Sequence, residues 1–105
     1  MTTVLKEVLN KRSYEAAEAY CKNNDIQVHY GKTLAITADI KRGDKILDMG
    51  CGTGELTSFL GEIVGREGRV VGVDPDFGRI QYAKQKHLSL NNNVVFEHEI
   101  GRAHV

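Results

Sequence analysis

Three glycines and two aspartates have the residue types and the spacing from which chemistry could be expected. Gly50, Gly52 and Gly54 stand at alternate positions, Asp48 precedes them, and Asp74 follows Gly50 by 24 residues. Glycine lets a backbone approach a ligand closely. An acidic side chain about 20 residues further along a strand-helix-strand unit can accept hydrogen bonds from ribose hydroxyls. The pattern therefore predicts a nucleoside-binding loop.

The residue after the last glycine narrows the choice of ligand. A dinucleotide-binding loop carries its third glycine where this chain has Glu55. A bulky carboxylate there opposes both close packing of the helix and a pyrophosphate, which disfavours NAD and FAD. The loop also lacks the Gly-Lys-Ser/Thr ending of an ATP- or GTP-binding loop. A nicotinamide-dependent oxidoreductase is therefore only a weak alternative.

The sequence around the loop resembles a known family. The segment LDMGCGTG (residues 47–54) is similar to the first motif of class I S-adenosylmethionine-dependent methyltransferases, and VVGVD (residues 70–74) is similar to their second. The resemblance extends over roughly residues 33–98. It implies a Rossmann-like parallel sheet, S-adenosyl-L-methionine as the cofactor and transfer of a methyl group to an acceptor.

The resemblance also implies roles for individual residues. In that family the glycine loop lies against the methionine part of the cofactor, so Asp48 would orient the loop and the ligand's amino group. Asp74 would hold the ribose hydroxyls, and Pro75 and Asp76 would border the adenine. The expected cofactor-binding residues are Asp48, Gly50, Cys51, Gly52, Gly54, Asp74, Pro75 and Asp76. Cys51 is expected to be a small loop residue without a nucleophilic role, and the sequence identifies no catalytic base.

Hydrophobic periodicity predicts the elements that position these residues. Strands are expected at residues 45–49, at 69–73 and from 94 onward, with helices at about 54–64 and 76–88 between them. Asp74 or Asp76 could cap the second of these helices. Strands alternating with helices imply an α/β fold with a parallel sheet and right-handed connections.

The N-terminal third is predicted to be helical. Residues 3–24 form two short helices or one broken helix, with Ser13 as a plausible N-cap, and residues 26–31 are a loop or a short extended piece. A further helix is expected at about 33–40. Tyr20 and Tyr30 are expected to pack rather than to form a lid over the cofactor, and His87, His98 and His104 to lie on the surface.

Composition excludes several classes of protein. Lys and Arg number 14, as do Asp and Glu, so the net charge is zero and no basic face indicates nucleic acid or a membrane surface. No apolar run is long enough for a membrane span or a signal sequence, which favours a cytoplasmic protein. The two cysteines form no CxxC pair, so neither a disulfide framework nor a zinc site is expected. The neutral charge and the resemblance favour a small-molecule methyl acceptor.

The C-terminal end predicts that the chain is incomplete. We expect a helical segment at residues 1–32, the N-terminal half of a methyltransferase domain at 33–99, and a non-native tail at 100–105. The tail, IGRAHV, is what ATC GGA AGA GCA CAC GTC encodes, and this resembles a common sequencing-library adapter. A sheet truncated after about three strands would leave the edge and the apolar face of strand 45–49 bare. Such a chain would bind the cofactor weakly and transfer nothing. The alternative is a non-catalytic Rossmann-like binding or assembly module.

Overall fold

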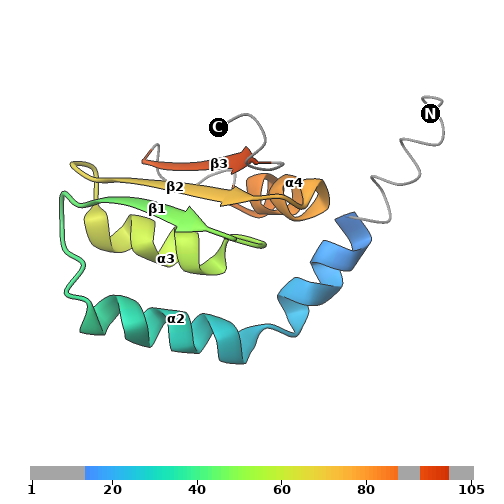
Figure 1. The fold of residues 1–105 in the computed structure, drawn as a ribbon, viewed down its shortest axis with the longest axis horizontal. Helices are drawn as coiled ribbons and strands as arrows, with labels where there is room; N and C mark the ends of the chain where they lie inside the picture. The colour runs from blue at the N-terminus through green and yellow to red at the C-terminus, as the bar shows by residue number, and fades with distance from the viewer. Residues whose placement is uncertain (1–13, 88–92, 100–105) are drawn as a thin grey trace.

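The computed structural model of the chain describes residues 14–87 and 93–99. The described elements are a helix at 14–22, then α2 (Asp25–Thr37), β1 (Lys45–Met49), α3 (Glu55–Val64), β2 (Arg69–Asp74), α4 (Phe77–Lys86) and β3 (Val94–His98) (Figure 1). From β1 onward strands and helices alternate as predicted. The predicted α/β class is confirmed.

The three strands form one parallel sheet in the order β1-β2-β3. Asp48 of β1 is level with Gly72 of β2, and Gly72 is level with Phe96 of β3. Parallel strands end at the same edge of a sheet. The loops that follow β1 and β2, which carry the predicted site residues, therefore lie next to each other.

Helices α3 and α4 cover the same face of this sheet. Val64 of α3 packs with Val70 of β2, and Ile80 of α4 packs with Phe96 of β3. Val70 and Phe96 share a face because Gly72 is level with Phe96 and side chains alternate along a strand. Each of these buried side chains contributes about 1.5–3 kcal/mol of hydrophobic stabilisation. The helices thus fix the sheet edge at which the loops meet.

The opposite face of β1 is bare. Leu47 is 60% exposed and Met49 is 63% exposed, and β1 is an edge strand among the described strands. This agrees with the prediction of an open edge and an uncovered apolar face at residues 45–49.

The segment at residues 26–31 was expected to be a loop or extended, and this prediction is wrong. It lies inside α2, which also ends at Thr37 rather than at residue 40. The only residue that α2 buries is Ala35, whereas Ile26, Tyr30 and Leu34 are exposed. The apolar residues of α2 therefore do not mark the side that packs. The helix also runs through residues 32 and 33, where a division of the chain was expected, and that division stays a prediction.

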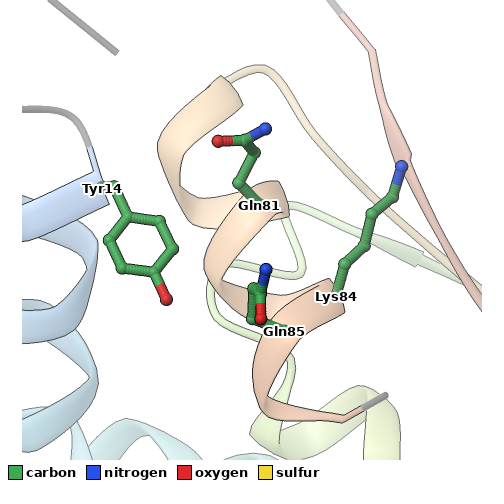
Figure 2. A pocket seen from close by; sticks show the side chains of 4 residues that line it. All are labelled: Tyr14, Gln81, Lys84 and Gln85. Carbon is green, nitrogen blue, oxygen red and sulfur yellow. The ribbon is translucent and has the colours of Figure 1, made fainter. Parts of the chain in front are cut away.

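The helix at 14–22 lies beside α4. The rings of Tyr14 and Tyr82 are 5.4 Å apart. A polar hollow of about 220 Å³ between the two helices is lined by Tyr14, Gln81, Lys84 and Gln85 (Figure 2). None of the predicted cofactor-binding residues lines it. The predicted cap at Ser13 and the predicted tail at 100–105 lie outside the described residues. Among those described, no helix has the length and apolar character needed to cross a membrane.

Candidate functional site

The loop between β1 and α3 has a backbone shape that favours glycine. The φ angles are 69° at Gly50, 59° at Gly52 and 89° at Gly54, all in the left-handed region. The backbone N–H of Cys51 donates to the carbonyl of Val73 at 2.9 Å, which ties the loop to β2. The alternate glycines are thus explained by local geometry.

Asp74 connects the two loops. Its Oδ2 accepts a hydrogen bond from the Gly52 N–H at 3.0 Å, and its Oδ1 accepts one from the Asp76 N–H at 2.8 Å. The residue is only 3% exposed. The structure therefore brings Asp74 against the glycine loop, as the spacing predicts. Each carboxylate oxygen keeps a second lone pair that a ribose hydroxyl could use once the covering residues move.

Asp48 lies at the end of β1, beneath the loop. The hydroxyl of Thr57 donates to its Oδ2 at 2.7 Å. Burial raises the pKa of Asp48, and the negative charge of Asp74 raises it further, while the Thr57 hydrogen bond opposes the shift. The pair of carboxylates creates a negative region that favours a cationic ligand group over an anionic one.

Pro75 and Asp76 lie where β2 passes into α4. Asp76 is the N-cap of α4, and its side chain accepts from the Arg79 N–H at 3.1 Å, which confirms the predicted cap. The carbonyl of Pro75 lies 2.9 Å from Nε2 of His98. His98 is exposed, as predicted. These residues therefore stand at the sheet edge beside the glycine loop.

A cavity of about 120 Å³ lies between the glycine loop and the N-terminal helices. Its lining residues are Tyr20, Asn24, Gln27, Val28, Asp48, Gly50, Cys51, Glu55 and Leu56. Three of the predicted cofactor-binding residues are among them. Tyr20 was expected only to pack, but it lines this cavity. Tyr30 is 65% exposed, so the prediction that it packs is wrong.

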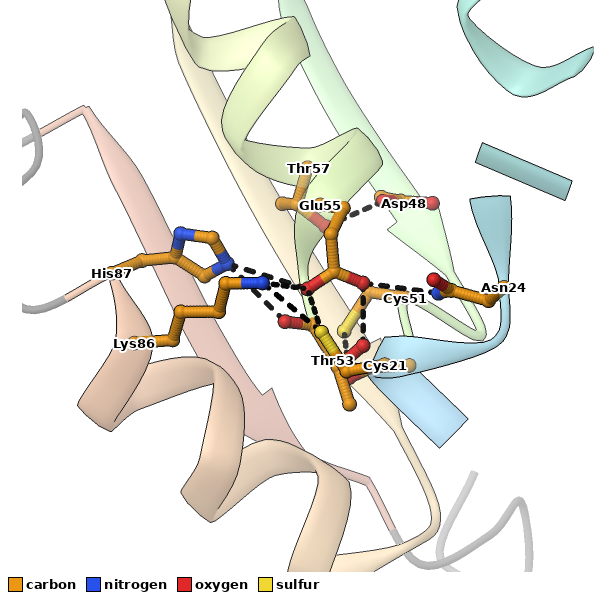
Figure 3. A network of polar contacts seen from close by, with 10 residues as sticks. Cys21, Asn24, Asp48, Cys51, Thr53, Glu55, Thr57, Lys86 and His87 are labelled. Carbon is orange, nitrogen blue, oxygen red and sulfur yellow. Dashed lines mark hydrogen bonds and ion pairs between the residues drawn. The ribbon is translucent and has the colours of Figure 1, made fainter. Parts of the chain in front are cut away.

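Glu55 forms a polar network that the sequence did not predict (Figure 3). Its Oε1 accepts from Nδ2 of Asn24 at 3.0 Å and from the hydroxyl of Thr53. Its Oε2 lies 3.8 Å from Nε2 of His87, whose ring is also 3.2 Å from the Thr53 carbonyl. The prediction that His87 is a surface residue is therefore wrong. Since these partners come from distant segments, periodicity carries no signal of the network.

The network controls the charge of Glu55. Burial by itself raises the pKa of the carboxyl group, but the nearby His87 ring and the hydrogen bonds from Thr53, Asn24 and Cys21 outweigh burial and hold the pKa well below its ordinary value. Glu55 therefore stays ionised, and the Lys86 ammonium 3.3 Å from its Oε2 offsets part of its charge.

Cys51 is expected to be a poor nucleophile. Burial, together with the charges of Asp48 and Asp74, raises the pKa of its thiol from 9.0 to about 12. Because the thiolate is the reactive form, iodoacetamide at pH 8.5 should modify Cys51 more than about a hundredfold more slowly than a free cysteine. Site-resolved mass spectrometry checks this. The rate should keep rising towards pH 12 and should become ordinary in urea, whereas a plateau near pH 9 would contradict the assignment.

Among the described residues, no group of three or more His, Cys, Asp or Glu side chains is placed to hold a metal ion. The charged groups near the loop instead take part in hydrogen bonds within the chain. The geometry fits an organic ligand that carries positive charge and hydroxyl groups.

Comparisons with known proteins identify the family of this domain. A family model described as a methyltransferase domain matches residues 40–102. A cobalt-precorrin-6B C(15)-methyltransferase (decarboxylating) from Saccharolobus solfataricus is 43% identical over 63 residues, which cover 57% of this chain and 32% of that protein. The chain spans 29% to 32% of the length of the curated relatives that it matches first.

Solved structures share the fold. A SAM-dependent methyltransferase from Aquifex aeolicus has a TM-score of 0.69 at 22% identity, covering 82% of this chain and 46% of that one. A structure described as an rRNA methylase from Clostridium thermocellum has a TM-score of 0.50 at 37% identity, covering 54% of this chain and 32% of that one. Because the family model matches more than half of the chain, the chain belongs to the methyltransferase domain family, and it shares the fold of a SAM-dependent methyltransferase.

Proposed function

We propose that this chain is part of an S-adenosylmethionine-dependent methyltransferase and holds the methionine and ribose end of the cofactor. Asp48 and the backbone at Gly50 and Gly52 would face the methionine part, and Asp74 would accept from the ribose hydroxyls. Pro75 and Asp76 would border the adenine. S-adenosylmethionine supplies a methyl group on a positively charged sulfur, so the protein mainly provides proximity and orientation.

The observation that carries this proposal is the charge around the loop. Asp74 accepts a hydrogen bond from the Gly52 N–H, and Asp48 lies at the end of β1 beneath the loop, whereas the Glu55 carboxylate is paired with Lys86. The two carboxylates beside the loop oppose a pyrophosphate but favour a sulfonium and an ammonium group. The open space beside Gly50, where a Cβ would meet no atom within 4 Å, gives such a ligand room to approach the backbone.

A small molecule is the acceptor that we propose. The net charge of zero provides no attraction for a polyanion, and the relative from Saccharolobus solfataricus is named for a precorrin substrate. An RNA acceptor is the second candidate, since the structure from Clostridium thermocellum is described as an rRNA methylase. Salt-dependent binding of RNA would favour the second candidate.

Calorimetric titration with S-adenosylhomocysteine tests the cofactor. The described residues form one end of a site, and the chain spans only about a third of its relatives, so we expect weak binding, on the order of 10 µM to 1 mM. NADH should not bind. Submicromolar affinity would contradict the proposal that the chain is a fragment, and binding of NADH in preference would contradict the cofactor.

The alternative is a non-catalytic assembly module. The bare face of β1, with Leu47 60% exposed and Met49 63% exposed, favours it because exposed apolar surface of this kind often marks an interface. A stable folded dimer that ignores S-adenosylhomocysteine would support this alternative over the methyltransferase.

A further inference from the structure

Glu55 occupies the first position of α3, directly behind the glycine loop, and its side chain contacts residues of the N-terminal helix and of α4. Figure 3 shows the carboxylate between Asn24 and Cys21 on one side and Lys86 and His87 on the other. The role proposed above for the loop backbone and for Asp74 leaves this arrangement unexplained.

The carboxylate joins three segments that are far apart in the sequence. Oε2 of Glu55 accepts from Sγ of Cys21 at 3.2 Å and from Nζ of Lys86 at 3.3 Å. The same ammonium group donates to the Cys21 sulfur at 3.0 Å. The side chain of Glu55 is 17% exposed and that of Lys86 is 42% exposed, so the carboxylate is shielded from solvent on its protein side while the ammonium group is partly solvated. Residues 14–24, which we name the N-terminal flap, are thereby attached to α3 and α4.

The flap covers the glycine loop through Tyr20. Cε1 of Tyr20 lies 3.5 Å from the position that a Cβ on Gly52 would take. The Arg79 guanidinium stacks on the same ring at 4.4 Å from its centroid. Because Tyr20 directly precedes Cys21 in the helix, a contact that fixes Cys21 also fixes Tyr20 against the loop.

We propose that Glu55 is a positioning residue that latches the N-terminal flap onto the glycine loop, so that the flap forms a movable wall of the cofactor cavity. Naming the ligand as the cofactor rests on the function proposed above. Tyr20 and Asn24 line the cavity from the flap, and Asp48 and Gly50 line it from the loop. A ligand in the cavity therefore contacts both sides.

The size of the cavity favours a wall that moves. Its volume is about 120 Å³ and it is partly open to solvent, whereas ligand sites for molecules of this size measure roughly 300 Å³ or more. We therefore expect the flap to move outward as the cofactor enters and to return over it. Weakening the latch should raise the rates of cofactor entry and of cofactor release. The release rate should rise more, because the bound ligand loses its contacts with the flap.

Hydrogen exchange measured by mass spectrometry on the full chain tests the latch without any ligand. Glu55→Gln keeps the shape of the side chain but removes the charge that faces Lys86. We expect amide exchange in residues 14–24 to become on the order of tenfold faster, while exchange in β2 stays unchanged. Glu62→Gln is the matched control, because Glu62 is an exposed residue of the same helix. Amide exchange in residues 14–24 of Glu62→Gln should match that of the unaltered chain.

A second variant protects the test against misfolding. Lys86→Met removes the ammonium group from both Glu55 and Cys21 but leaves the hydrogen bonds from Asn24 and Thr53 to Glu55. It should also accelerate exchange in residues 14–24 alone. Unchanged exchange in both variants would overturn the latch, and so would equal acceleration in residues 14–24 and in β2, which indicates global destabilisation.

A ligand arm separates the latch from the proposed function. S-adenosylhomocysteine should slow amide exchange of residues 14–24 in the unaltered chain. In stopped-flow measurements, it should dissociate several-fold faster from Glu55→Gln than from the unaltered chain. If the ligand has no effect on the unaltered chain, the proposed cofactor fails. The latch is still tested in that case, because amide exchange of Glu55→Gln and Lys86→Met is measured without ligand.

Discussion

Replacing Gly54 with Ala is expected to destabilise the domain by about 3 kcal/mol, a large share of the stability of a small protein. The φ angle of Gly54 is 89°, which costs a residue with a Cβ about 1–2 kcal/mol. An added Cβ would also lie 2.7 Å from Cζ of Phe96 and 3.0 Å from Cδ2 of His87. Phe96 is a buried core residue, so its ring cannot move aside without repacking, which costs typically 1–3 kcal/mol. Urea unfolding followed by circular dichroism measures the loss.

Gly50→Ala is the matched control for this prediction. Gly50 has a similar φ angle of 69°, but a Cβ there would meet no atom within 4 Å. The change should therefore cost only the backbone contribution, about 1–2 kcal/mol. Since Gly50 lines the cavity, the added methyl group should weaken binding of S-adenosylhomocysteine in a chain that still folds. Equal loss of stability in the two variants would show that contact with Phe96 is not what makes Gly54 necessary.

This contrast between two glycines shows what a sequence can and cannot predict. The alternate glycines after a strand predict the loop, because a left-handed backbone shape and close approach are local properties. Which glycine is packed against the core depends on Phe96, 42 residues further along the chain. The distinction between Gly50 and Gly54 therefore needs the tertiary structure.

The same contrast between local patterns and tertiary contacts applies to the predicted strands and helices. Strand β2 was predicted to within one residue, because buried strands in a parallel sheet are runs of apolar residues, and the edge strand β1 was predicted with its observed bounds. Helix α2 was misplaced because Ile26 and Tyr30 face solvent, so its apolar residues gave no packing pattern.

Within the site, the sequence predicted the glycine loop and Asp74 and missed the side chains that meet at Glu55. Asp74 was placed on the loop by its spacing. Glu55 was interpreted as an obstacle to a pyrophosphate, which stays a prediction, and its contacts with Cys21 and Lys86, 34 and 31 residues away, were not foreseen. Contacts of this kind follow from the packing of helices, which periodicity does not specify.

Asp74→Asn is expected to have the largest effect on ligand binding. Both oxygens of Asp74 accept from backbone N–H groups, of Gly52 at 3.0 Å and of Asp76 at 2.8 Å. An asparagine amide would direct its NH₂ group at one of these donors, which leaves a buried N–H without an acceptor and costs about 1–3 kcal/mol. The variant also loses the negative charge proposed to face the ribose. Binding of S-adenosylhomocysteine should fall by about a hundredfold, a loss that calorimetric titration measures.

A second readout separates loss of charge from loss of shape in this variant. The charge of Asp74 contributes to the raised pKa of both Asp48 and the Cys51 thiol. In Asp74→Asn the pKa of Cys51 should therefore fall, so its alkylation by iodoacetamide should begin at lower pH. Asp39→Asn is the control, because Asp39 has a side chain 87% exposed and asparagine tolerates its φ angle of 59°. If Asp74→Asn shifts the Cys51 profile but leaves ligand affinity equal to that of Asp39→Asn, then Asp74 supports the loop without contacting the ribose.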